Sequence, residues 1–159
     1  MSVDQDRVYL TGYSMGGFGT WETASYAPER FAAIAPVSGG GNVEQAERLK
    51  SIPIWAFHGD QDRVVPIEAS QRMVDAVRMR GGQVNFTIYP GAGHGVSEMT
   101  YQNKQFYVWL LGQRRSPLAQ MPSGDGKRAN SPRTSAGQET FRHCFSTASQ
   151  AVEANEESH

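Results

Sequence analysis

The chain has 159 residues, a length that fits one domain. Its formal net charge of −1, from 15 basic and 16 acidic residues, argues against a nucleic-acid partner or an anionic membrane surface. The single cysteine, Cys144, excludes an intrachain disulfide, and no apolar run reaches the roughly 18 residues of a membrane span.

Apolar runs and turn signals alternate through the first part of the chain. The predicted strands are RVYLTG (7–12), FAAIAPVSG (31–39), PIWAFHG (53–59) and VNFTIYP (84–90). The predicted helices cover 15–26, the stretch from Pro66 to the stop at Gly81 and Gly82, and 102–111 with Phe106, Trp109 and Leu110 buried. Short apolar strands separated by helices imply parallel crossovers and a covered sheet. We therefore predict an α/β fold, with a parallel sheet of about four strands and helices on both faces.

Residues 116–159 differ in composition from the part before them. This stretch is rich in Ser, Ala, Gly and charged residues and poor in large aliphatic side chains. Such a segment cannot bury enough apolar surface to offset the entropy of ordering it. We predict a folded region over 1–115 and a mostly disordered tail over 116–159.

The turn after the first strand contains a serine between two glycines. GYSMG places Ser14 between Gly12 and Gly16, directly after a predicted strand and before a predicted helix. In a nucleophile elbow the serine occupies a strained turn, and the flanking glycines avoid clashes. The helix N-terminus favours developing negative charge, and the backbone N–H of Met15 would donate to an oxyanion. The pattern favours a catalytic serine over an ordinary glycine-rich turn.

A nucleophilic serine needs a base and an orienting carboxylate, and after a nucleophile elbow these follow in the order Asp or Glu, then His. FHGDQDRVVP offers Asp60 and Asp62 at the end of the third strand, and YPGAGHGVS offers His94 at the end of the fourth. Ligand sites of open parallel sheets lie at these strand ends. Because aspartate also caps turns, the residues alone leave the choice between Asp60 and Asp62 open.

Each candidate has a simpler interpretation beside the catalytic one. His94 could be a loop histidine without a role. His58 is expected to pack at a strand end or to bond locally, with a metal site shared by Asp60 and Asp62 as the alternative. Three tryptophans are expected in the core rather than under a substrate: Trp21, Trp55 and Trp109.

Three segments together resemble the α/β-hydrolase superfamily, closest to its serine esterase, phospholipase/carboxylesterase and prolyl-oligopeptidase-like group. They are DRVYLTGYSMGGFGTWETASYAPERFAAIAPVSGGG, PIWAFHGDQDRVVP and YPGAGHG, and the resemblance covers about residues 4–115. It implies Ser14 as nucleophile, His94 as base and Asp62, rather than Asp60, as the acid. It also implies hydrolysis of a small-molecule carboxylic ester through an acyl-enzyme, without cofactor or metal. A serine peptidase and a non-catalytic remnant are the alternatives.

Members of this group have several strands before the nucleophile strand, and one upstream loop supplies a second oxyanion donor. Thirteen residues precede Ser14, so we expect 1–115 to correspond to the C-terminal portion of a hydrolase. Half an oxyanion hole would lower kcat by about 10²–10³. RVYLTG would lie at an exposed sheet edge, where a second copy could pair. Localisation stays open, with the cytoplasm as default, since any export signal would lie upstream of Met1.

Overall fold

The computed structural model describes residues 3–115. Its strands are β1 (Tyr9–Tyr13), β2 (Ala33–Val37), β3 (Ile54–Gly59) and β4 (Val84–Tyr89). Its helices are α1 (Met15–Tyr26), α2 (Glu68–Met79), α3 (Ser97–Tyr101) and α4 (Lys104–Gly112), with 3₁₀ turns η1 (Gln5–Arg7), η2 (Pro28–Arg30) and η3 (Val43–Leu49). The predicted disordered tail, 116–159, lies outside the described residues.

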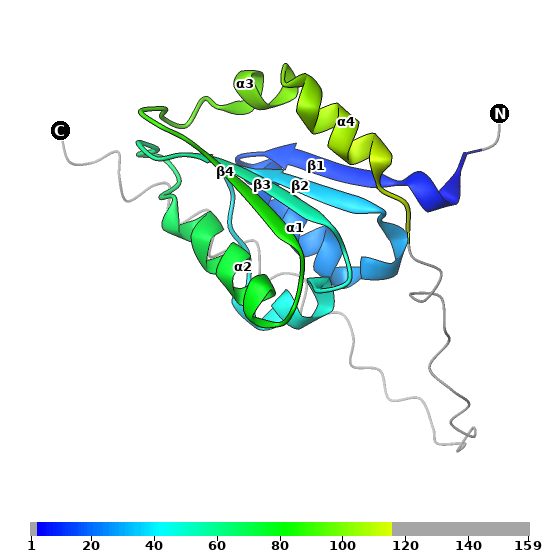
Figure 1. Ribbon diagram of the computed structural model, residues 1–159. Helices are drawn as coiled ribbons and strands as arrows, with labels where there is room; N and C mark the ends of the chain where they lie inside the picture. Colours follow the sequence, from blue (N-terminus) through cyan, green and yellow to red (C-terminus); the bar gives the residue numbers. More distant parts are fainter. Residues whose placement is uncertain (1–2, 116–159) are drawn as a thin grey trace, which may run out of the picture. The chain divides into compact units, whose positions relative to one another are not determined.

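The strands form one parallel sheet in the order β1-β2-β3-β4, which confirms the predicted α/β architecture (Figure 1). Every residue of β2 is buried, whereas β1 and β4, at the two edges of the described sheet, are half-buried. The continuous apolar sequence of β2 reflects this central position, because both faces of a strand in a covered parallel sheet are buried. All four strands run the same way, so the turns that follow them gather at one end of the sheet.

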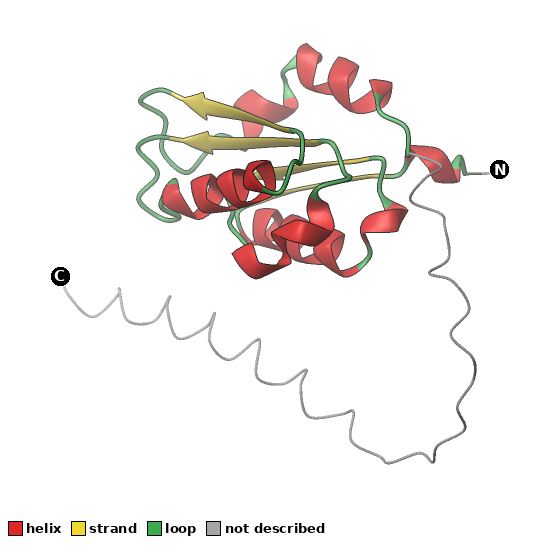
Figure 2. Ribbon diagram, turned by 60° about the horizontal axis from the view of Figure 1, so that its bottom comes forward, coloured by secondary structure: helices red, strands yellow, loops and turns green. Residues whose placement is uncertain are grey.

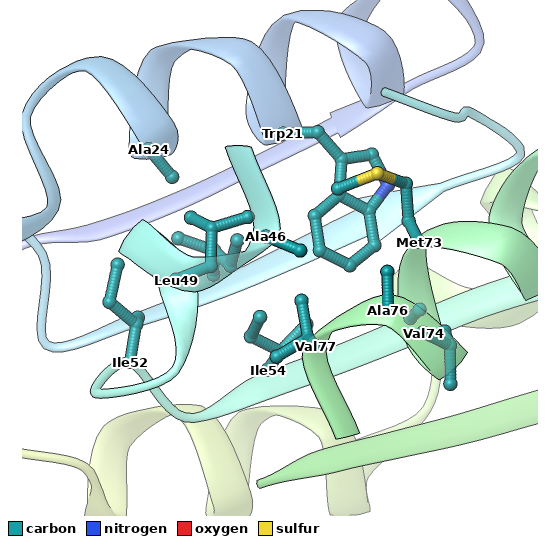
Figure 3. Packing of buried hydrophobic residues seen from close by; sticks show 12 residues of the cluster. Trp21, Ala24, Ala46, Leu49, Ile52, Ile54, Met73, Val74, Ala76 and Val77 are labelled. Atoms are coloured by element: carbon teal, nitrogen blue, oxygen red, sulfur yellow. The ribbon is translucent and has the colours of Figure 1, made fainter. Parts of the chain in front are cut away.

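One face of the sheet is covered by α1, η3 and α2. Trp21 of α1 and Met73 of α2 lie side by side in this layer, and Leu49 of η3 packs beside Ala46 (Figure 3). These side chains are almost fully buried, and the Trp21 indole N–H donates to the carbonyl of Gly39 at 3.1 Å. This layer fixes α1, and with it the turn from which α1 starts, against the centre of the sheet.

The other face carries α3 and α4 (Figure 2). Phe106 and Leu110 of α4 pack with Val37 and Phe57 of the central strands. Helices on both faces agree with the prediction. No helix within residues 3–115 combines the length and apolarity that a membrane span requires.

The last predicted helix, 102–111, differs from the structure. The helix begins at Lys104, because the Asn103 side chain accepts from the N–H of Gln105 at 2.9 Å and acts as its N-cap. A separate short helix, α3, precedes it and was not predicted, since it buries only Thr100. Trp109 is half-buried rather than buried, with its ring edge-on to Trp55 at 5.4 Å.

Candidate active site

Ser14 occupies the tight turn between β1 and α1. Its backbone has φ 55° and ψ −118°, a conformation that residues other than glycine rarely adopt. A Cβ at Gly12 would lie 2.3 Å from the carbonyl oxygen of Gly16, so the turn closes only with glycine at position 12, whereas a Cβ at Gly16 would meet open space. The Ser14 N–H donates to Val37 O at 2.9 Å, which ties the turn to the end of β2.

Met15 begins α1 directly after this turn. The N–H groups of a first helical turn have no partner within their own helix and carry the positive end of its dipole. Further along that turn, the N–H groups of Gly17 and Phe18 donate to Ser14 O at 2.8 and 3.1 Å. The Met15 N–H directly follows the serine at this positive end of the helix, a position suited to stabilise negative charge on a bound oxygen.

His94 lies in the loop that follows β4. Its Nε2 is 2.8 Å from Ser14 Oγ and its Nδ1 is 2.7 Å from Asp62 Oδ2. An ionised carboxylate only accepts hydrogen bonds, so the ring hydrogen resides on Nδ1 and Nε2 is free to accept from the serine hydroxyl. The structure thus brings three predicted residues, 80 and 32 positions apart along the chain, into one hydrogen-bonded series.

Asp62 has a fully buried side chain in the loop after β3. Its Oδ1 accepts from the N–H groups of Val64 and Val65, each at 2.9 Å, which leaves Oδ2 for the imidazole. Burial alone would raise the pKa of this carboxyl, but the hydrogen bonds from His94, Val65 and Val64 outweigh burial and lower it below its usual value. Asp62 is therefore ionised at neutral pH.

Asp60, the other candidate carboxylate, has a different partner. It is exposed, and its Oδ1 accepts from the N–H of Gly91 at 2.7 Å. The N–H of Gln61 likewise donates to Ala92 O at 2.9 Å. These bonds join the loop after β3 to the loop after β4, so Asp60 braces the segment that carries His94 and does not contact the imidazole.

Tyr13 also contacts His94, and the sequence analysis did not single it out. Its hydroxyl donates to the His94 backbone carbonyl at 3.0 Å, and the two ring centroids are 5.0 Å apart. Burial, and then the charge of Asp62, raise the pKa of the Tyr13 phenol, which favours the protonated hydroxyl that this bond needs. Tyr13 directly precedes the serine, but nothing in the local pattern signals a contact 81 residues away.

His58 is fully buried at the end of β3, and it bonds locally as the sequence suggests. Its ring nitrogens lie 2.7 Å from Ser70 Oγ and 2.9 Å from Val65 O. Within the described residues, no three His, Cys, Asp or Glu side chains are grouped to hold a metal ion. Because both ring nitrogens already have partners, His58 is poorly suited to act as a ligand.

Comparisons with known proteins identify a family and several relatives. The model of the family described as "Dienelactone hydrolase family" matches residues 1–107. Carboxylesterase SOBER1 of Arabidopsis thaliana is 32% identical over 101 residues, which are 60% of this chain and 44% of that protein. The bifunctional acetylxylan esterase/xylanase XynS20E of Neocallimastix patriciarum is 38% identical over 64 residues, 40% of this chain and 10% of that protein.

Solved structures show the same fold. The crystal structure of a thermostable esterase matches with 43% identity and a TM-score of 0.69, over 71% of this chain and 32% of that one. The acylaminoacyl peptidase of Pyrococcus horikoshii, at 18% identity and a TM-score of 0.62 over 77% of this chain and 26% of that one, is similar in fold alone. The chain spans less than half the length of the curated relatives it matches.

Proposed function

The chain belongs to the dienelactone hydrolase family, within the α/β-hydrolase superfamily, and from this membership we propose that it acts as a serine hydrolase on carboxylic esters. One observation carries the proposal: the continuous hydrogen-bonded series Ser14 Oγ, His94 Nε2, His94 Nδ1 and Asp62 Oδ2, with contacts of 2.8 and 2.7 Å. This arrangement activates a hydroxyl as a nucleophile.

In the proposed reaction, Ser14 Oγ attacks the ester carbonyl while its proton passes to His94 Nε2. The carboxylate of Asp62 stabilises the imidazolium that results, and the N–H of Met15 donates to the oxyanion. The intermediate collapses to an acyl-enzyme as the alcohol leaves with the proton from His94. Water then attacks the acyl group, His94 takes its proton, and the carboxylic acid departs as Ser14 regains its hydrogen.

The relatives favour esters over amides as the proposed substrates. A carboxylesterase and a solved esterase are similar to this chain at 32% and 43% identity, whereas the peptidase is similar only in fold. An alcohol is also an easier leaving group than an amine. Hydrolysis by this route needs water as the second substrate and no cofactor.

The proposal is tested with a fluorophosphonate probe, which reacts with activated serines. We expect the wild-type chain to be labelled, Ser14→Ala to remain unlabelled, and Ser51→Ala, a change at an exposed loop serine, to label like wild type. Labelling that survives in Ser14→Ala would show a different nucleophile. A folded wild-type chain that does not react would instead support the non-catalytic alternative.

Turnover is measured separately from labelling with p-nitrophenyl acetate and a p-nitroanilide of the same acyl group. We expect release of p-nitrophenol to exceed release of p-nitroaniline. Faster cleavage of the anilide would favour a peptidase instead.

A further inference from the structure

We propose that His58 is a positioning residue for the carboxylate of Asp62, acting through the backbone of Val65; this inference rests on the proposed function. His58 is completely buried and has no contact with Ser14 or with solvent, so it takes no part in the reaction described above. Its contacts nevertheless lead directly to the acid.

The first contact fixes the loop that holds Asp62. His58 Nε2 lies 2.9 Å from the carbonyl oxygen of Val65, and since a carbonyl only accepts, this nitrogen must carry a hydrogen. The N–H of the same Val65 donates to Asp62 Oδ1 at 2.9 Å. The histidine therefore holds one end of a residue whose other end holds the carboxylate.

The second contact reaches the carboxylate itself. His58 Nε2 is 3.2 Å from Asp62 Oδ2, the oxygen that also accepts from His94 Nδ1. The hydrogen on Nε2 is the one donated to Val65 O, so this close approach limits the space in which Oδ2 could turn away from His94. Both oxygens of the buried carboxylate are thus held, and Oδ2 keeps its direction toward His94.

The far side of the ring is anchored in the core. His58 Nδ1 lies 2.7 Å from Ser70 Oγ of α2, and Ser70 Oγ lies 2.8 Å from the carbonyl oxygen of Gly39, so the one hydroxyl hydrogen of Ser70 can serve either contact. Ser70 is itself buried, and Gly39 also accepts from the indole of Trp21. The imidazole of His58 therefore cannot turn without breaking its contacts to Ser70 of α2 and to Val65.

A matched pair of variants separates positioning from packing. The side-chain amide nitrogen of glutamine reaches about the same place as histidine Nε2, so His58→Gln keeps a donor for Val65 O, whereas His58→Leu fills a similar volume without one. We expect His58→Gln to react with the fluorophosphonate within about threefold of wild type. His58→Leu should react about tenfold to a hundredfold more slowly, because a misplacement of about 1 Å costs about 10² in rate.

A spectroscopic readout does not depend on reaction. The hydrogen between His94 Nδ1 and Asp62 should give a strongly downfield ¹H NMR signal in wild type and His58→Gln, and this signal should be broadened or lost in His58→Leu. Nitrogen-15 spectra of the wild type should show a hydrogen on His58 Nε2. If His58→Leu does not fold, that wild-type measurement and Ser70→Ala, which should slow labelling severalfold, still test the inference.

Two results would overturn the inference. One is a folded His58→Leu variant with wild-type labelling and an unchanged downfield signal, since a packing role alone would affect only stability. The other is a His58 Nε2 without hydrogen in the wild type. Failure of the proposed function would give a different result, because the wild-type chain itself would then not be labelled.

Discussion

Replacement of Asp62 by asparagine tests the proposed chemistry most directly. In the native site the N–H groups of Val64 and Val65 both donate to Oδ1 at 2.9 Å, so the amide oxygen of the variant should take that position. The NH₂ group then replaces Oδ2 and faces His94 Nδ1. Two donors cannot share that contact, so the imidazole hydrogen moves to Nε2, and Ser14 loses the acceptor for its proton.

The expected loss follows from this change of tautomer. Converting the orienting aspartate of a serine triad to asparagine lowers kcat by about 10⁴, which at 1.36 kcal/mol per tenfold is about 5.4 kcal/mol of transition-state stabilisation. The NH₂ group would also lie against the hydrogen-bearing Nε2 of His58, 3.2 Å from Oδ2 in the native site. We expect that mismatch to lower the free energy of unfolding by about 1–3 kcal/mol.

The assay is the second-order rate of fluorophosphonate labelling at pH 8, with folding verified by circular dichroism. Asp60→Asn is the matched control, because the side-chain bond that Asp60 accepts from the N–H of Gly91 needs only an oxygen, which asparagine retains. We expect the control to label within about threefold of wild type. If folded Asp62→Asn labels within tenfold of wild type, Asp62 does not orient the base and the reasoning is wrong.

Four further outcomes are expected. Gly59→Ala should lower the free energy of unfolding by about 1–3 kcal/mol and slow labelling, because its Cβ would lie 2.3 Å from Ala92 O in the loop that carries His94. Tyr13→Phe should cost about 0.5–1.5 kcal/mol of stability through loss of the hydroxyl bond to His94 O. Asp62, whose folded-state pKa is lowered, stabilises the fold above its unfolded pKa of about 3.9, and this contribution is lost as pH falls through the lower folded value. In urea titrations the wild type should therefore lose stability below about pH 4 more steeply than Asp62→Asn. Finally, β1 lies at the edge of the described sheet, so light scattering should detect a mass above that of one chain.

Each of these outcomes has a contrary result. Gly93→Ala is the control for Gly59→Ala, because the nearest atom to its added Cβ is Gln61 O at 3.8 Å; equal losses in the two variants would contradict the steric explanation. Unchanged stability in Tyr13→Phe would mean that the hydroxyl bond contributes nothing. Parallel acid curves for wild type and Asp62→Asn would show that the carboxyl has no lowered pKa. A single-chain mass at all concentrations would contradict pairing at the edge.

Much of the fold could be predicted from the sequence because the patterns are local. The helix predicted over 15–26 is α1, Met15–Tyr26, since the serine turn starts it and Pro28 limits it. The 3₁₀ turn Val43–Leu49 and α3 could not be predicted, because each buries only one or two side chains and shows no clear helical period. The alternation of strands and helices along the chain was enough to predict a parallel sheet. The burial of each tryptophan could not be predicted in this way, because it depends on tertiary contacts.

The candidate site likewise has parts that a local sequence pattern predicts and parts that depend on the fold. The turn around Ser14 has a strong local signature, whereas Asp60 and Asp62 stand two positions apart and differ only in what the fold places opposite each one. Tyr13 and Ser70 bond to partners 81 and 12 positions away along the chain. Their roles depend on distances that no local pattern contains.

The hydrogen bonds between the loops after β3 and β4 affect which contacts of the site break first on partial unfolding. Those loops carry the acid and the base as one unit, through Asp60 to Gly91 and Gln61 to Ala92. The serine belongs to a second unit, held by β2. Two part-buried contacts, of His94 with Ser14 and with Tyr13, and the buried contact of Ser70 with Gly39 join the two halves in the side-chain hydrogen bonds described. The part-buried contacts are the more accessible to solvent. Gentle heating or dilute denaturant should break the contacts of His94 with Ser14 and Tyr13 first. The rate of fluorophosphonate labelling should then fall while the helical circular dichroism signal is unchanged.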